Sequence, residues 1–271
     1  MSKIIIDSDI PELQSFAQDE LVRIGRDNDG GYVVSKIALE KSDVLFSGGY
    51  GNDFSFENAF VSRFPEKKAV IFDYSITIVS ICRGLFGALV RKVVKRPHYP
   101  IDYHFRNLRT YFLLKFTPRV RLVHAMLTSS QDRKKPLCMN LERAFQVASG
   151  NSVSQLYCKL DIEGSEYELV GELVSLQSRI SGMVIEFHDT FHKRKEFLEG
   201  LKLLDECYVN THTHVNNYGG VGPDSQPVVY EISFLNKRLW DGARSNGAKD
   251  SWVTSDQPNN PQQPEIVLNF S

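Results

Sequence analysis

Acidic and imidazole side chains gather where apolar runs of this sequence end, a pattern that can bind a polar substrate and move a proton. If those runs are neighbouring strands of a parallel sheet, their carboxyl ends meet at one edge. An imidazole ionises near neutral pH, so a histidine there could take a proton from a substrate hydroxyl. The side chains concerned are Asp161, Glu163, Glu186, His188, Asp189 and His214.

A glycine-rich turn lies upstream of these residues. It reads SGGYGND over residues 47–53 and follows the apolar run Val44–Ser47. Glycines permit a tight turn and let a ligand approach the backbone closely. The next apolar run, Ala69–Phe72, ends in Asp73, and an acid at that place can accept hydrogen bonds from both hydroxyls of a ribose. The turn and Asp73 together predict a site for an adenine nucleoside.

Two carboxylates beside the turn bear on which nucleoside binds. Asp53 and Glu57 flank the start of a predicted helix, Phe54–Arg63. They would repel the pyrophosphate of NAD and suit a cationic or zwitterionic ligand such as S-adenosylmethionine. Alternatively, both carboxylates only cap the helix. We predict S-adenosylmethionine as the cofactor, bound by Gly48, Gly49, Gly51, Asp53, Asp73, Tyr74 and Asp161.

Several short runs resemble the FkbM-type methyltransferases. The resemblance spans most of residues 20–237, and the DxEGxE pattern is its most specific part. It implies an adenosylmethionine-dependent fold with seven strands that methylates oxygen, often on sugars or polyketides. It also implies that Gly49, Gly51 and Asp73 bind the cofactor and that Asp161 lies where cofactor and acceptor meet. The matching runs are RIGRDNDGGYVV (23–34), SGGYGNDFSFE (47–57), KLDIEGSE (159–166), VIEFHD (184–189) and HVNNYG (214–219).

Methyl transfer to a hydroxyl needs alignment and a base, because the sulfonium is itself an adequate electrophile. We assign Asp161, His188 and His214 to catalysis, with either histidine as the base. Alternatively, a divalent cation such as Mg²⁺, held by Asp161 and Glu186, would lower the pKa of the acceptor hydroxyl. Phe187 stands where metal-dependent O-methyltransferases have a second carboxylate, which weakens the metal hypothesis.

Seven apolar runs predict the sheet that positions these residues. Their alternation with helical segments is typical of an α/β, Rossmann-like, doubly wound and mainly parallel sheet, and the resemblance implies that this sheet is of the class I methyltransferase type. The last two runs are joined by Asn217–Pro227 without a helix, which predicts an antiparallel last strand. The expected strands are Val44–Ser47, Ala69–Phe72, Val120–His124, Leu156–Leu160, Gly182–Glu186, Tyr208–His212 and Val229–Leu235, and the expected helices are Phe54–Arg63, Glu163–Leu173 and Lys193–Leu204.

With the resemblance, the alternation of strands and helices predicts a single methyltransferase domain at residues 1–240. Two segments do not follow this alternation. A basic insertion at about residues 80–119 could be a solvated helical face, a lid over an anionic acceptor, or a patch that meets anionic lipid at a membrane surface. Residues 241–271 form a polar tail that we expect to be loosely held, although Ile266–Phe270 could dock on the body. The insertion contains Arg91, Lys92, Lys95, Arg96, Arg106, Arg109 and Lys115, with Asp102 as its only acid.

The composition is that of an ordinary globular protein, with 42% hydrophobic residues, 24% charged residues and a net charge of −1. This charge offers no field for a nucleic acid, so we expect a small-molecule or glycan acceptor, with or without a phosphate. The N-terminus does not read as a secretory signal, and no apolar run has the length of a membrane span, so we expect a cytoplasmic protein. The four cysteines form no C-x-x-C pair, which indicates reduced thiols.

Three other functions stay open at this stage. A metal-dependent hydrolase could use His188 with His192, or His212 with His214, whose spacings mimic zinc sites, although His212 lies deep enough in its strand to be a core residue. An NAD-binding oxidoreductase could use the glycine turn, although Asp53 disfavours a pyrophosphate there. A non-catalytic binding module could keep the same fold.

Overall fold

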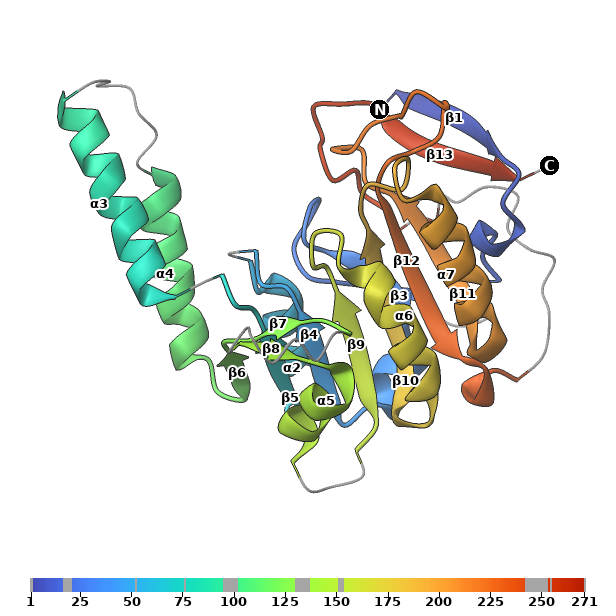
Figure 1. The fold of residues 1–271 in the computed structure, drawn as a ribbon, viewed down its shortest axis with the longest axis horizontal. Coiled ribbons are helices and arrows are strands. Elements are labelled where there is room, and N and C mark those ends of the chain that lie inside the picture. Colours follow the sequence, from blue (N-terminus) through green and yellow to red (C-terminus); the bar gives the residue numbers. More distant parts are fainter. Residues whose placement is uncertain are drawn as a thin grey trace.

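The computed structural model describes residues 2–16, 21–51, 53–75, 77–94, 102–129, 137–150, 154–241, 253 and 255–270. Its centre is a sheet of seven strands in the order β11-β12-β10-β9-β4-β5-β6 (Figure 1). Strand β12 is antiparallel to both of its neighbours, and the other pairings are parallel. The strands are β4 (Val44–Gly48), β5 (Lys68–Phe72), β6 (Val120–Val123), β9 (Leu156–Leu160), β10 (Ile180–Phe187), β11 (Tyr208–Val215) and β12 (Tyr230–Asn236).

This architecture confirms the predicted fold class and all seven predicted strands. The chain runs outward from β4 through β5 to β6 and then returns to β9, on the other side of β4. The strand order therefore reverses between β4 and β9. In open α/β sheets the crevice outside the carboxyl ends at such a point is the usual ligand site.

Both faces of the sheet are covered, because side chains of successive residues on a strand point to opposite faces. Phe46, Cys158 and Ile185 pack in one buried cluster with helices α5, α6 and α7. Leu45 and Tyr157 pack in another cluster with α1, α2 and the hairpin of β2 and β3. The covering elements are α1 (Lys36–Lys41), α2 (Ser55–Arg63), α5 (Leu141–Ser149), α6 (Glu166–Ser175), α7 (Arg194–Cys207), β2 (Leu21–Ile24) and β3 (Tyr32–Ser35).

The two ends of the chain pair with each other. Strand β1 (Lys3–Ser8) is parallel to β13 (Glu265–Phe270), and the figure shows both strands beside the β11 edge of the sheet (Figure 1). Ile266 and Leu268 are buried in the main core. The expectation of a loosely held tail is therefore wrong for residues 255–265, whereas the docking considered for Ile266–Phe270 is what the structure shows. A pairing strand at the other end of the chain satisfies the tail's backbone groups, and β13 buries its apolar side chains.

The basic insertion forms a pair of helices, α3 (Ile78–Val94) and α4 (Asp102–Phe116), that project from the β6 edge of the sheet (Figure 1). Ile81 and Ala88 of α3 and Tyr111 and Leu114 of α4 are buried. Lys95 and Arg96 lie outside the described residues. After β6 come two short strands, β7 (Met126–Leu127) and β8 (Cys138–Met139), which pair with each other. Short 3-10 turns are found at Pro11–Leu13, Gln177–Arg179 and Lys237–Leu239.

Candidate functional site

The glycine turn after β4 brings the carboxyl ends of β4, β5 and β9 together. The N–H of Gly49 donates to the carbonyl of Phe72 at 3.0 Å, and the N–H of Asp161 donates to the carbonyl of Gly48 at 3.0 Å. Gly49 has a φ of 88° and Gly51 a φ of 53°. A Cβ atom added to Gly49 would lie 1.7 Å from the carbonyl oxygen of Asp161. Only glycine allows the turn to pass so close to the end of β9.

This close approach predicts a large difference between two alanine substitutions. Gly49→Ala should lower the free energy of unfolding by about 3 kcal/mol or more, because the added methyl group collides with the backbone. Gly51→Ala is the matched control, since a Cβ there meets nothing within 4 Å, and the positive φ alone should cost about 1 kcal/mol. Urea unfolding measures both values. Equal losses for the two variants would contradict the role given to Gly49.

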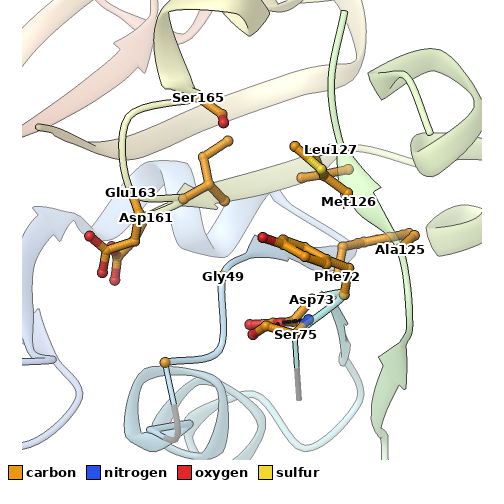
Figure 2. Close-up of a pocket in the computed structure, with 13 residues that line it drawn as sticks. Gly49, Phe72, Asp73, Ser75, Ala125, Met126, Leu127, Asp161, Glu163 and Ser165 are labelled. Carbon is orange, nitrogen blue, oxygen red and sulfur yellow. Dashed lines mark hydrogen bonds between the residues drawn. The ribbon is translucent and has the colours of Figure 1, made fainter. Parts of the chain in front are cut away.

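A pocket of about 450 Å³ lies in the crevice at the strand reversal (Figure 2). Asp161 and Glu163 lie at one end of it, and Ala125, Met126 and Leu127 lie at the other. The pocket is thus acidic at one end and apolar at the other. The remaining lining residues are Gly49, Gly51, Phe72, Asp73, Tyr74, Ser75, Ile162 and Ser165.

Asp73 is held in a defined orientation in this pocket. Its Oδ2 accepts a hydrogen bond from the N–H of Tyr50 at 2.9 Å. Its Oδ1 accepts from both the N–H and the hydroxyl of Ser75, each at 2.7 Å. A carboxylate has about four acceptor positions, so these three bonds orient Asp73 and leave capacity for a ligand hydroxyl.

A second pocket, of about 260 Å³, adjoins the first and shares Gly51, Asp161 and Glu163 with it. Arg26 and Asp53 form an ion pair of 3.1 Å at its side. Acidic side chains outnumber basic ones in the lining. The acidic residues are Asp29, Asp53, Glu57, Asp161, Glu163 and Glu186, and the basic ones are Arg26, Lys159 and His188.

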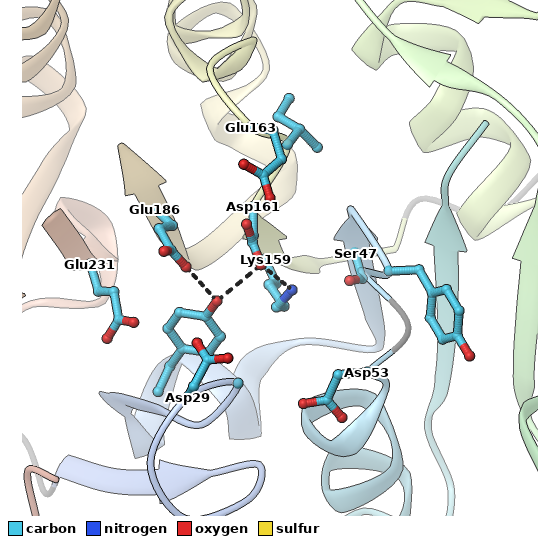
Figure 3. A network of polar contacts seen from close by, with 12 residues as sticks. Asp29, Ser47, Asp53, Lys159, Asp161, Glu163, Glu186 and Glu231 are labelled. Carbon is cyan, nitrogen blue, oxygen red and sulfur yellow. Dashed lines mark hydrogen bonds and ion pairs between the residues drawn. The ribbon is translucent and has the colours of Figure 1, made fainter. Parts of the chain in front are cut away.

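A buried network links the carboxylates of the second pocket (Figure 3). The hydroxyl of Tyr32 donates to Glu186 at 2.8 Å and lies 3.2 Å from Oδ2 of Asp161. The ammonium of Lys159 is 3.4 Å from the same Asp161 oxygen. Asn216 donates to the other oxygen of Glu186 at 2.9 Å. Burial and the neighbouring charge of Asp161 raise the pKa of Glu186 well above its usual range.

His188 follows β10 and faces this network. Its Nδ1 lies 3.0 Å from Oε1 of Glu166, a fully buried carboxylate at the start of α6. Its Nε2 lies 3.8 Å from Asp161 and 3.6 Å from Glu186. Burial lowers the pKa of His188, but the hydrogen bond to Glu166 and the charges of Glu186 and Asp161 together raise it to about 9. At neutral pH the ring is therefore an imidazolium that balances the surrounding carboxylates.

Three residues of the site were not predicted as functional from the sequence: Tyr32, Lys159 and Glu166. Glu166 also accepts hydrogen bonds from the N–H groups of Ile162 and Gly164. A buried carboxylate that fixes one nitrogen of a histidine while the other faces a cleft is the arrangement of an orienting residue and a base. The available signal was their place in the runs that resemble the FkbM-type family: Lys159 and Glu166 in KLDIEGSE, and Tyr32 in RIGRDNDGGYVV.

The charges around Asp161 do not fit a divalent cation. One ligand atom each of Asp161, Glu186 and His188 lie within 4.8 Å of one another. However, Lys159 already places an ammonium beside Asp161, and it would repel a cation. Both oxygens of Glu186 already accept hydrogen bonds, from Tyr32 and Asn216. The predicted cation at Asp161 and Glu186 is therefore not supported.

The predicted cofactor residues divide between the two pockets. Gly49, Gly51, Asp73, Tyr74 and Asp161 line the first pocket. Asp53 lines only the second, where it pairs with Arg26 and accepts from Ser55. Its assignment to the cofactor stays a prediction. Gly48 is buried in β4, and a Cβ there would meet the side chain of Leu127 at 2.8 Å, so its role is close packing beside the pocket.

His214 does not line either of these pockets, so the prediction that it faces the cleft is wrong. It is buried, with Nδ1 2.9 Å from Glu231 and Nε2 3.1 Å from Glu265 of the C-terminal strand. The carboxylates of the antiparallel strand and of the tail cover it on both sides. His212 is buried against Asp256 at 2.8 Å, which confirms that it is a core histidine.

The histidine pairs whose spacing resembles a zinc site contact other side chains instead. His192 is exposed and lies 2.6 Å from Asp189, in a turn that precedes α7 and not on a helix shared with His188. His212 and His214 lie in β11, and their partners are Asp256 of the C-terminal segment and Glu231 of β12. Neither pair forms a metal site open to a substrate.

No family model and no curated protein matches the chain. Among solved structures, a fibrillarin/Nop5p complex is similar with a TM-score of 0.39 at 9% identity, over 86% of this chain and 99% of the other. The methyltransferase FkbM from Methylobacillus flagellatus KT is similar with a TM-score of 0.37 at 12% identity, over 71% of this chain and 44% of the other. The Methanococcus jannaschii fibrillarin pre-rRNA processing protein has a TM-score of 0.38 at 8% identity, over 87% of each chain. At these identities and TM-scores the likeness says nothing about activity, which must come from the site itself.

Proposed function

We propose that this protein is an S-adenosylmethionine-dependent O-methyltransferase that acts on a hydroxyl of a sugar or glycan precursor. The observation that carries the proposal is the pair of adjoining pockets that share Asp161, Glu163 and Gly51 at the strand reversal. One pocket suits the cofactor and the other the acceptor. The shared wall is the place where a methyl group would pass from one to the other.

The charge of the first pocket favours adenosylmethionine over NAD. Its lining includes Asp73, Asp161 and Glu163, and no Lys or Arg among the described residues. A pyrophosphate would be repelled there, whereas a sulfonium and an amino group are attracted. Asp73 is oriented to accept from a ribose hydroxyl, and the apolar end at Met126 and Leu127 suits an adenine ring. The same charges disfavour an oxidoreductase.

The second pocket suits a neutral polyol better than a phosphate-bearing acceptor. Carboxylate oxygens accept hydrogen bonds from sugar hydroxyls. The excess of acids in the lining would repel a phosphate dianion, so the phosphate-bearing alternative loses support. Arg26 is the exposed cation of this pocket, and its ion pair with Asp53 reduces its attraction for an anion.

The proposed chemistry uses His188 as the base and Glu166 as its positioning residue. Bound adenosylmethionine supplies an electrophilic methyl group on a sulfonium. Asp161 orients the acceptor hydroxyl between the two pockets. The neutral form of His188, whose pKa is raised to about 9, accepts the hydroxyl proton at Nε2 as the oxygen–carbon bond forms and the carbon–sulfur bond breaks. Glu166 holds Nδ1, so that Nε2 faces the acceptor and the resulting imidazolium is stabilised.

A thermal-shift experiment with Asp73 variants tests the cofactor assignment. S-adenosylhomocysteine should raise the unfolding temperature of the wild type, and NAD should not, because a ligand of the native state stabilises it by mass action. Asp73→Ala should weaken adenosylhomocysteine binding by at least about 10-fold, the loss of one charge-assisted hydrogen bond. Asp73→Asn, which keeps one acceptor oxygen, should lose less.

Glu199→Ala, an exposed carboxylate on α7, is the matched control and should bind like the wild type. Unchanged affinity in a folded Asp73→Ala protein would rule out the ribose contact. A shift with NAD and none with adenosylhomocysteine would replace the methyltransferase by an oxidoreductase.

A further inference from the structure

The pair of helices α3 and α4 exposes large apolar side chains on both helices. Phe86 is 69% exposed and Phe116 is 80% exposed, and Val79, Phe105 and Phe112 are also exposed. A shallow groove on the outer side of α3, lined by Ile78, Val79, Cys82, Arg83, Phe86 and Gly87, is almost wholly apolar. An exposed apolar groove flanked by further exposed aromatic side chains is a candidate interaction site.

The same helices carry a concentrated positive charge. Residues 78–116 contain eight Lys and Arg residues and one acid, Asp102, in a chain whose net charge is −1. Arg83, Arg109 and Lys115 are exposed, and none of the ion pairs among the described residues joins them to a carboxylate. The charge is therefore available to an external anionic partner.

Basic and apolar side chains share the same outward faces. On α3, Val79, Arg83 and Phe86 are spaced at i, i+4 and i+7, and on α4 the same spacing joins Phe105, Arg109 and Phe112. Residues at these spacings lie on one side of a helix. A helix that mixes apolar side chains such as Phe with Arg on one exposed side is typical of an element that lies in the interface of a bilayer.

We propose that α3 and α4 form a docking surface for an anionic lipid membrane. The aromatic and aliphatic side chains enter the boundary between headgroups and acyl chains, and the Arg and Lys side chains contact the lipid phosphates. No helix among the described residues is long and apolar enough to cross a membrane, so the contact proposed is with one leaflet. This proposal is independent of the chemistry assigned to the pockets.

A second copy of the chain is the less suitable occupant. Two such helix pairs packed face to face would bring together two basic surfaces with almost no acids to pair with them. Like charges in a contact oppose association. An anionic bilayer pairs with the charge and covers the apolar side chains at the same time.

Vesicle flotation with the full-length protein tests the proposal. The wild type should float with vesicles of phosphatidylcholine and phosphatidylglycerol at low salt and should not float with phosphatidylcholine alone. Phe86→Ser with Phe116→Ser should reduce the bound fraction at least about tenfold, because two aromatic side chains no longer leave water. Arg83→Glu with Arg109→Glu should have a similar effect, because the attraction to the anionic surface falls.

Ile5→Ser with Leu203→Ser is the matched control. These residues are also exposed and apolar, but they lie on β1 and α7, and this variant should float like the wild type. Circular dichroism and thermal unfolding establish that each variant is folded. A wild type that stays unbound to anionic vesicles would overturn the proposal. So would a wild type that is a dimer in solution and becomes a monomer on Phe86→Ser with Phe116→Ser, since the surface would then be a self-interface.

Discussion

Replacing His188 with alanine is expected to lower kcat/KM by about 10²–10⁴-fold, the usual contribution of a positioned general base. The pH dependence follows from the raised pKa of His188, about 9 against an ordinary value of 6.5. Below pH 9 most of the ring is protonated and cannot accept a proton. The rate of the wild type should therefore rise about tenfold per pH unit up to about pH 9 and then level off. An assay of adenosylhomocysteine release, with the neutral sugar that reacts fastest as acceptor, measures kcat/KM of both proteins at each pH.

Glu166→Gln separates the positioning role from a purely structural one. Removing the buried carboxylate lowers the stability of the imidazolium, so the inflection of the pH profile should move to lower pH. A profile that falls above pH 9 would instead make protonated His188 the active form and contradict its role as the base. The imidazolium stabilises the folded state fully below pH 6.5 and loses this contribution as the pH rises through about 9, so unfolding must be followed at each pH.

Asp161→Asn is expected to lower kcat/KM by about 10²–10³-fold while the affinity for adenosylhomocysteine changes by less than about tenfold. Asp161 lies at the wall between the pockets, 3.4 Å from Lys159 and within reach of Tyr32. The amide keeps the size of the side chain but cannot orient the acceptor hydroxyl as a charged acceptor does. Turnover assays and calorimetric titration measure the two effects separately.

Glu199→Gln on α7 controls for the loss of a negative charge, because Glu199 is exposed and outside both pockets. It should retain wild-type turnover. If Asp161→Asn remains folded and turns over at the wild-type rate, Asp161 does not act at the junction of the two pockets. The assignment of one pocket to the cofactor and the other to the acceptor would then be wrong as well.

The sheet and the location of the site could be predicted from the chain alone. Apolar runs of strand length, separated by helical segments, specify buried parallel strands, and the carboxyl ends of such strands align at one edge. For this reason Asp73, Asp161 and His188 could be placed at a common crevice. Gly49 could likewise be assigned to a tight turn from the sequence, because few other residues tolerate its backbone conformation.

Which side chains meet at that crevice was decided by the tertiary structure. Tyr32 and Glu186 are 154 positions apart in the chain, and no local pattern predicts their hydrogen bond. The alternation of side chains along its strand predicts that His214 faces the cleft, but the C-terminal strand places Glu265 against it. Sequence periodicity indicates the direction of a side chain from its own strand. What covers that side chain depends on segments distant in sequence, and their packing determines burial, charge pairing and protonation.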